Sequence, residues 1–197
     1  MRRIVITRIA TVSSVAALPP ALAEREKMLL DRTMRLALSA VRKEPAKMIE
    51  EARIRPVART DRTGWDCLYQ GYAEFYRVSQ TAAMRDTVWG WLHDPTALQE
   101  GLVAEASDGH LIGLAHYRPF ARPLSATTGG FLDDLFVAPK ARGSGIAEAL
   151  LAALKVIAIQ RGWSVVRWIT AEDNVRARAL YDRVASKTQW VTYDIKP

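Results

Sequence analysis

Cysteine and histidine are scarce in this chain of 197 residues, and their scarcity excludes two classes of protein. The single cysteine, Cys67, has no partner within the chain for a disulfide, and a lone thiol suits a reducing compartment. The three histidines, His93, His110 and His116, are scattered and show no metal-ligand spacing with the cysteine or with an acid pair. We therefore expect neither a disulfide scaffold nor a bound metal.

Long apolar runs are missing as well. A helix that spans a membrane needs about 20 consecutive apolar residues, and no stretch of this sequence approaches that length. We expect no membrane span and no membrane partner.

Acidic residues are depleted only in the N-terminal part of the chain. Residues 1–47 contain 10 Lys or Arg and 4 Asp or Glu, whereas residues 48–197 contain 18 and 17, so the net charge of +7 belongs mostly to the first segment. A strongly basic protein often binds nucleic acid. Because the part that carries the fold signals is nearly neutral, we expect no nucleic-acid partner.

The segment 1–47 has three interpretations. Residues 1–23 contain three arginines, no acid and a weak apolar stretch, which resembles a signal or transit peptide. Residues 23–42 have roughly helical apolar spacing and predict an accessory helix. Alternatively, Met48 is the true start, because residues 48–57 lead directly into the first expected strand. We expect an N-terminal extension at 1–47 and the functional domain at 48–197.

Periodicity after residue 48 predicts alternating elements of an α/β domain. Helices are expected from Thr60 or Asp61, as the cap, to residue 77, and over 81–92, 145–161 and a segment from Asn174. Strands are expected at 54–57, 101–105, 111–117 and 132–138, with a β-rich run at 164–170 and a loop at 118–130. The expected fold class is a mixed, mostly antiparallel central sheet with helices on both faces.

One loop carries a candidate phosphate site. Residues 131–147 predict a strand that runs through a basic, glycine-containing loop into a helix. Gly143 and Gly145 allow close backbone approach to an anion, the first N–H groups of the helix point toward it, and Arg142 adds a positive charge. This combination predicts that a phosphorylated ligand binds here.

Two known phosphate-binding patterns fail on this loop. A P-loop needs a lysine directly after its last glycine, and none follows Gly145. A dinucleotide fingerprint needs a third glycine, where this chain has Glu148. A dinucleotide-binding oxidoreductase therefore remains only as an alternative.

A third pattern fits. The spacing Arg/Gln-x-x-Gly-x-Gly/Ala is filled by Arg142, Gly145 and Ala147, and it resembles the acetyl-CoA pyrophosphate loop of the GNAT superfamily of N-acetyltransferases. The preceding run 132–139 is similar to the fourth strand of that family. The run 174–181, with Asn174, Ala177 and Tyr181, is similar to its Asn-x-x-Ala-x-x-Leu/Phe-Tyr helix.

The resemblance implies roles for these residues. The cofactor, acetyl-CoA, would contact the strand end, the loop and the later helix: Leu135, Phe136, Val137, Arg142, Gly143, Ser144, Gly145, Ile146, Ala147 and Asn174. Tyr181 would be the general acid for the departing thiolate. Asn174 has a structural alternative as a helix N-cap, and Tyr181 as a packed aromatic.

The base and the acceptor side are less determined. Asp133 and Asp134 are candidates for the base, and because neighbours on a strand point to opposite faces, at most one is expected to face the pocket. Trp65, Tyr69, Tyr72 and Tyr76 share one helix face. Such a stripe suits core packing, and the resemblance adds the alternative that Tyr72 and Tyr76 line the acceptor pocket.

We thus expect a cytoplasmic N-acetyltransferase that moves an acetyl group from acetyl-CoA to a primary amine by direct attack. The acceptor is a small molecule or a protein amine, and a homodimer is compatible with the resemblance. A non-catalytic module that binds acyl-CoA as a regulatory ligand is the main alternative, since it would need Arg142 and Gly145 but not Tyr181.

Overall fold

The computed structural model describes residues 52–197, so the leader and accessory helix expected within residues 1–47 lie outside the described residues. One five-stranded sheet organises this part of the chain, with its strands in sequence order from edge to edge. The strands are β1 (Arg53–Pro56), β2 (Glu100–Glu105), β3 (Leu111–Arg122), β4 (Thr127–Val137) and β5 (Val166–Arg167). The first four pair antiparallel, and β5 joins β4 in parallel.

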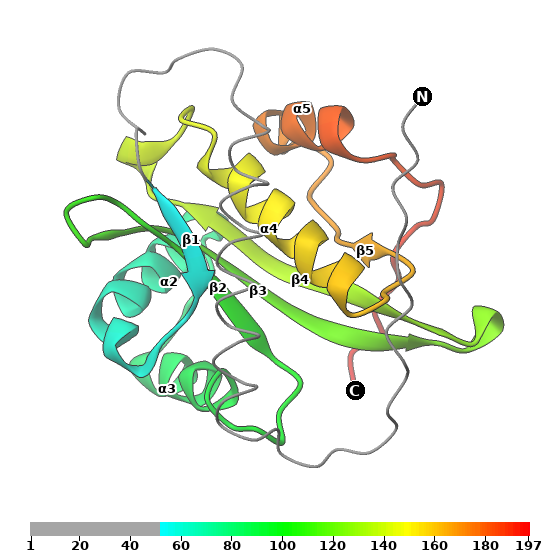
Figure 1. Ribbon diagram of the computed structural model, residues 1–197, viewed down its shortest axis with the longest axis horizontal. Helices are drawn as coiled ribbons and strands as arrows, with labels where there is room; N and C mark the ends of the chain where they lie inside the picture. The colour runs from blue at the N-terminus through cyan, green and yellow to red at the C-terminus, as the bar shows by residue number, and fades with distance from the viewer. Residues whose placement is uncertain (1–51) are drawn as a thin grey trace, which may run out of the picture.

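Helices cover both faces of this sheet (Figure 1). They are α2 (Arg62–Tyr76), α3 (Ala82–Trp91), α4 (Ile146–Gln160) and α5 (Val175–Val184). On one face α2 and α3 enclose a cluster around Trp65 and Phe136. On the other face α4 packs in the larger cluster, against which Leu180 and Tyr181 of α5 also pack. The expected mixed, mostly antiparallel sheet with helices on both faces is confirmed.

The apolar stripe of α4 provides much of the core. Ile146, Leu150, Leu154 and Ile157 are all buried against the sheet, as their helical spacing predicts. Complete burial of a side chain of this size stabilises the fold by about 1.5–3 kcal/mol. Because Ile146 is the first residue of α4, this packing also fixes the position of the helix N-terminus.

The start of α2 differs from the expected cap. Neither side chain proposed as the cap makes a capping bond to α2. The Asp61 carboxylate instead accepts the Ala58 N–H and two bonds from Arg55 of β1, which also pairs with Glu105 of β2. The aspartate therefore ties the helix start to the edge of the sheet, because Arg55 competes for its oxygens.

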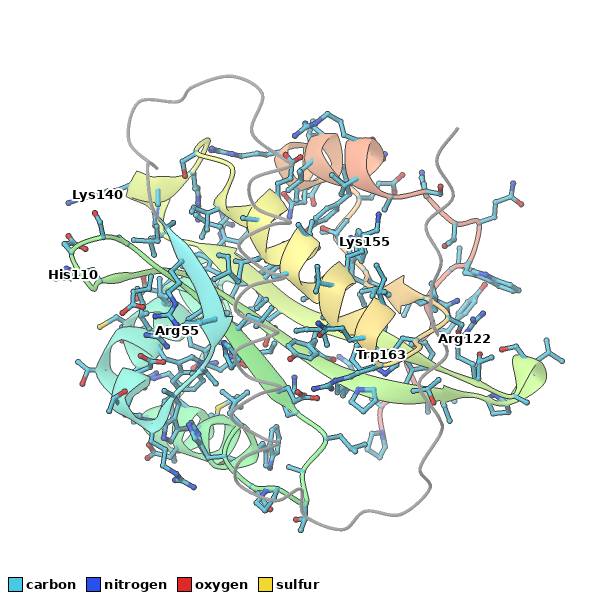
Figure 2. The ribbon with its side chains drawn as sticks, viewed as in Figure 1. Arg55, His110, Arg122, Lys140, Lys155 and Trp163 are labelled. Carbon is cyan, nitrogen blue, oxygen red and sulfur yellow. The ribbon has the colours of Figure 1, made fainter. Side chains whose placement is uncertain are left out.

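Residues 118–130 form a hairpin arm rather than the expected loop. The ladder between β3 and β4 continues from Arg118↔Phe131 to Arg122↔Thr127, and this arm extends beyond the helices (Figure 1). The glycines that suggested a loop serve close packing. A Cβ on Gly129 would lie 2.7 Å from the Phe120 ring, and one on Gly130 would lie 2.3 Å from the Trp163 ring. Figure 2 shows Trp163 at the end of α4, beside the arm that carries Arg122.

Strand β4 contains an irregularity that positions the site. His116 pairs with Asp134, but the next residue, Tyr117, pairs with Leu132, so Asp133 is an extra residue in β4. Such a β-bulge interrupts the regular alternation of side chains. Accordingly Leu132 packs on the α4 face whereas Phe136, an even number of residues later, packs on the α2 face.

Within the β-rich run 164–170, the strand itself is limited to Val166 and Arg167, and Ser164 and Val165 add backbone hydrogen bonds to Thr128 and Gly130 of β4. Within the described residues, none of the helices has the length and apolar character that crossing a membrane requires.

Candidate functional site

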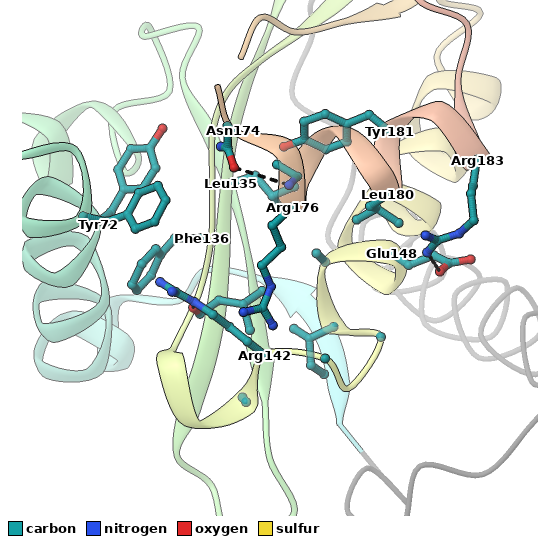
Figure 3. A pocket seen from close by; sticks show the side chains of 18 of the residues that line it. Tyr72, Leu135, Phe136, Arg142, Glu148, Asn174, Arg176, Leu180, Tyr181 and Arg183 are labelled. Atoms are coloured by element: carbon teal, nitrogen blue, oxygen red, sulfur yellow. Dashed lines mark hydrogen bonds and ion pairs between the residues drawn. The ribbon is translucent and has the colours of Figure 1, made fainter. Parts of the chain in front are cut away.

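A cavity of about 350 Å³ lies where β4 ends and α4 begins, with α5 and the end of α2 as its other walls. Figure 3 shows side chains from all four elements around it. Of the residues expected to contact the cofactor, nine line this cavity: Leu135, Phe136, Val137, Arg142, Gly143, Gly145, Ile146, Ala147 and Asn174. Ser144 is not among its lining residues, and its hydroxyl donates to the Ala141 carbonyl.

The glycine loop presents the N-terminus of α4 to the cavity. Gly143 and Gly145 both have φ of 85°, a conformation that favours glycine, and Gly145 is the N-cap of α4. A Cβ on Gly145 would meet no atom within 4 Å, so the space beside it is open. The first N–H groups of a helix have no partner within that helix and carry partial positive charge. This loop therefore has the geometry of an anion site.

Arg142 is fixed beside this helix end. Its Nε donates to the Val137 carbonyl at 3.1 Å, and its guanidinium lies over the rings of Phe75 and Phe136 at 5.2 and 5.5 Å. In the part of the chain that the structure describes, its two terminal nitrogens make no ion pair or hydrogen bond. They are thus available to an anion in the cavity.

A second arginine, Arg176, was not found from the sequence. It lines the cavity from α5, and one of its terminal nitrogens would lie 3.9 Å from a Cβ placed on Gly143. Figure 3 shows its side chain extending from α5 toward Arg142. The nearby Glu148, in the first turn of α4, pairs with Arg183 at 3.5 Å. Arg142 and Arg176 therefore place two positive charges beside the loop, while the Glu148 carboxylate is paired with Arg183.

Asn174 is the N-cap of α5, which was one of the two roles expected for it. The Asn174 side-chain oxygen accepts the Ala177 N–H at 3.3 Å, so this residue caps the helix, and it also lines the cavity. The cap leaves the amide nitrogen to donate to Thr170 at 3.4 Å. Capping thus fixes the orientation of α5 and of the residues that follow on its inner face.

Tyr181 lies on that inner face and lines the cavity. Its ring packs edge-on against Trp168, with 5.3 Å between centroids. Burial, followed by the nearby Tyr76 phenol, raises the pKa of Tyr181 to about 12. The phenol therefore keeps its proton at neutral pH.

The aromatic residues on one face of α2 serve both expected roles, core packing and lining of the cavity. Trp65 is fully buried, whereas Tyr72 and Tyr76 line the cavity. Both tyrosines also border a second, much smaller cavity, together with Asp133, Thr170 and Tyr181. Core packing and pocket lining thus occupy successive parts of one helix face.

The two aspartates lie on the same side of the sheet, and the expectation that they point to opposite faces is wrong. Asp134 contacts His116, to which Trp65 of α2 donates. Asp133 pairs with Arg118, which follows His116 by two residues on β3 and therefore lies on the same face. The extra residue in β4 is the cause, because it shifts the alternation between Asp133 and Asp134. Of the two, Asp133 lines the smaller cavity.

The partners of the two carboxylates differ. Asp133 accepts from Gln99 and from Arg118 Nε, both at 3.2 Å. Burial nevertheless raises the pKa of Asp133 above its usual range. Asp134 instead contacts His116, with 2.8 Å between its Oδ2 and the ring Nδ1. Residues 52–197 contain no cluster of three or more His, Cys, Asp or Glu that could hold a metal ion.

Comparison with known proteins places this geometry in a family. Residues 65–185 match the model of the acetyltransferase (GNAT) family. The D-amino-acid N-acetyltransferase HPA3 of Saccharomyces cerevisiae is 29% identical over 152 residues, which are 76% of this chain and 94% of that protein.

Solved structures of acetyltransferases share this fold. A ribosomal-protein-alanine N-acetyltransferase from Brucella melitensis biovar Abortus 2308 superimposes with a TM-score of 0.59 and 26% identity, over 74% of this chain and 99% of that one. AAC(6')-Iy, solved in complex with the bisubstrate analogue CoA-S-monomethyl-acetylneamine, has a TM-score of 0.64 and 20% identity, over 75% of this chain and 99% of its own.

Proposed function

Because the chain belongs to the acetyltransferase (GNAT) family, we propose that it moves an acetyl group from acetyl-CoA to a primary amine by direct attack on the thioester. The observation that carries this proposal is the cavity in which Arg142, Arg176 and the N-terminus of α4 meet at one end, and Tyr181 lies on another wall. An anion site and a proton donor in one cavity suit a cosubstrate with phosphates and a thioester.

The pyrophosphate of CoA fits the glycine loop. Open space beside Gly145 admits a phosphate, the N–H groups of the first turn of α4 can donate to it, and Arg142 and Arg176 can neutralise its charge. Ile146 and Ala147 would contribute backbone N–H groups rather than side chains. The solved complex of AAC(6')-Iy with a CoA analogue supports this ligand class for the fold.

The arm of CoA would continue along β4. Because β5 pairs with β4 only at Gly130 and Phe131, the segment from Leu135 to Val137 lies beyond the paired part of that edge. Its backbone can bond to the amides of the pantetheine arm. The thioester would then lie between the end of β4 and Tyr181.

The amine must lose a proton before it can attack. A primary amine with a pKa near 10.4 is neutral in only about one molecule in 2,500 at pH 7, a cost of about 4.6 kcal/mol. Asp133 and Asp134 are the candidates that can accept this proton, directly or through a hydroxyl or water. Tyr72 and Tyr76 would form the wall against which the acceptor lies.

The departing thiolate must gain a proton, and Tyr181 is the proposed donor. Its raised pKa of about 12 keeps the phenol protonated throughout the neutral range. A protonated phenol can donate a hydrogen bond as negative charge develops on sulfur, and it can transfer its proton as the C–S bond breaks.

One relative supports a proposal for the acceptor class. The similar yeast enzyme is a D-amino-acid N-acetyltransferase, which favours a free amino acid as the acceptor here. The ion pair of Arg118 with Asp133 suits such a zwitterion, because an ammonium group can bind the aspartate and a carboxylate the arginine. We further propose that the enzyme works in the reducing cytoplasm, where its free Cys67 would stay a thiol.

The test is a turnover assay with acetyl-CoA that detects the released thiol, run against D- and L-amino acids, polyamines, aminoglycosides and peptides with free N-termini. We expect thiol release that depends on one acceptor class. Tight CoA binding without turnover on any amine would instead support a non-catalytic acyl-CoA-binding module. Binding of NADH without binding of CoA would support the oxidoreductase.

A further inference from the structure

Behind the acceptor wall runs a buried chain of three polar side chains. The Trp65 indole Nε1 donates to His116 Nε2 at 2.8 Å, and His116 Nδ1 lies 2.8 Å from Asp134 Oδ2. Trp65 is 0% exposed and His116 is 1% exposed. The imidazole thus lies in the interior, between an aromatic donor and a carboxylate.

This arrangement fixes where the imidazole carries its proton. An indole N–H can only donate, so His116 Nε2 must be the acceptor of that bond. The proton of the neutral ring then lies on Nδ1, from which it donates to Asp134. Contact with the Tyr69 ring, at 4.9 Å between centroids and nearly perpendicular, holds the imidazole in place. One carboxylate oxygen is therefore held in a fixed orientation.

The rings of α2 connect this pair to the cavities. The Tyr69 ring lies 4.9 Å from the His116 ring and 6.2 Å from the Tyr72 ring, between centroids, and Tyr72 lines both cavities. Burial, and after it the charge of Asp134, raises the pKa of both tyrosines. Tyr72 thus lies between the His116–Asp134 pair and the acceptor space, whereas Asp133 is already paired with the cationic Arg118.

We propose that His116, oriented by Trp65, is a positioning residue that holds Asp134 to accept the proton of the acceptor amine through the Tyr72 hydroxyl. The inference rests on the proposed acetyl transfer. As the amine nitrogen forms its bond to the acetyl carbon, its N–H proton passes to the Tyr72 oxygen, and the Tyr72 proton passes to Asp134. Tyr72 ends neutral, Asp134 ends protonated, and water takes the proton from Asp134 after the product leaves.

The decisive variants are His116→Leu and His116→Asn. Leucine fills a similar space without a donor, whereas the asparagine amide can donate to Asp134 near the position of Nδ1. We expect His116→Leu to lower kcat at least about 10-fold, with KM for acetyl-CoA unchanged within about 2-fold. His116→Asn should recover most of that loss. Tyr117→Phe is the matched control, because it removes a buried hydroxyl from the next residue of β3, on the other face of the sheet.

A double-mutant cycle separates a relay from mere packing. If Tyr72 and His116 serve one proton path, Tyr72→Phe combined with His116→Leu should lose little more activity than the worse single variant. Multiplicative losses in the double variant, or equal losses for His116→Leu and His116→Asn, would overturn the proposal.

Nitrogen-15 NMR of the labelled histidines tests the proton position directly. Two rings should carry a proton on Nδ1, because His93 Nδ1 lies 3.0 Å from the Trp89 carbonyl and must donate to it, and one of these two signals should disappear in His116→Asn. A proton on Nε2 would overturn the proposed geometry. If wild-type protein turned over no amine, both the proposed function and the relay would fail, whereas normal turnover with multiplicative losses would remove the relay alone.

Discussion

Gly145 meets two requirements at one position, a positive φ and open space in front of the N-terminus of α4. An L-residue in this conformation costs about 1–2 kcal/mol, and an aspartate would also place a negative charge where we propose a pyrophosphate. We expect Gly145→Asp to weaken CoA binding at least about 10-fold, in line with losing favourable helix-terminus and arginine interactions. Isothermal calorimetry with CoA measures this loss.

The chain offers a matched control for backbone strain. Gly109, in the β2–β3 turn, has the same φ of 85°, and a Cβ added there would likewise meet no atom within 4 Å. Gly109→Asp should therefore cost similar stability but leave CoA affinity unchanged. Unchanged affinity in Gly145→Asp as well would remove the pyrophosphate site from the proposed function.

Tyr181→Phe removes one hydroxyl and keeps the ring that packs on Trp168. If the phenol is the acid, turnover should fall about 10²-fold or more, while CoA affinity and thermal stability stay close to wild type. The loss should shrink with acyl donors whose thiol has a lower pKa, because a better leaving group needs less protonation. Rates measured where chemistry is limiting decide this, and wild-type turnover in the variant would leave Tyr181 as a packing residue.

The raised pKa of Tyr181 also predicts how kcat depends on pH. Since the folded-state pKa of Tyr181 is raised to about 12, the phenol stays protonated from neutral pH through moderately alkaline conditions. Deprotonation of Tyr181 should therefore cause no decline of kcat between pH 7 and 10. A decline in that range that is present in wild type and absent from Tyr181→Phe would contradict this assignment.

Residue identity predicted much of the cavity but not all of it. Arg142, Gly145, Asn174 and Tyr181 were predicted because motif spacing fixes them, and all four line one cavity. Arg176 occupies a variable position of the same motif, so no spacing rule identified it. Its proximity to Gly143 depends on the packing of α5 against the loop, which a local pattern does not encode.

At the scale of elements, local patterns predicted the helices well and the long-range pairing poorly. The apolar stripe of α4 predicted both the helix and its buried face, since helical periodicity is a local property. The bulge at Asp133 depends on the register between β3 and β4, so strand alternation gave the wrong faces for the two aspartates. Prolines and glycines likewise suggested a loop at 118–130, because the cross-strand contact of Gly129 with Phe120 and the contact of Gly130 with the distant Trp163 appear only once the strands pair.

A substitution in the hairpin arm tests whether Gly130 is needed for close packing against Trp163. Gly130→Ala would place a Cβ 2.3 Å from the Trp163 ring, so the arm or the ring must move. Overpacking of this kind costs about 1–3 kcal/mol, and urea denaturation should show a loss of that size. Gly90→Ala is the control, because a Cβ in this helix would meet nothing within 4 Å and should stabilise by about 0.5–1 kcal/mol. Equal stability of both variants would contradict the packing role of Gly130.

At the scale of the whole molecule, the net charge is unevenly distributed along the chain. Residues 1–47 carry +6 of the net charge of +7, and residues 48–197 are almost neutral. The match to the family covers 65–185. We therefore propose that residues 48–197 are the catalytic domain and that residues 1–47 are an accessory extension.

A protein of residues 48–197 should accordingly fold and bind acetyl-CoA with the affinity of the full chain, as measured by thermal melting and calorimetry. The control is a shorter protein of residues 58–197, which lacks β1. That deletion removes Ile54, which is 2% exposed in the core, and Arg55, which ties Asp61 to Glu105. Loss of one such buried aliphatic side chain alone costs about 2–5 kcal/mol, so the shorter protein should be insoluble or melt far lower. If the protein of residues 48–197 were also insoluble while the full chain behaved well, residues 1–47 would belong to the folded domain, and the proposed boundary at Met48 would be wrong.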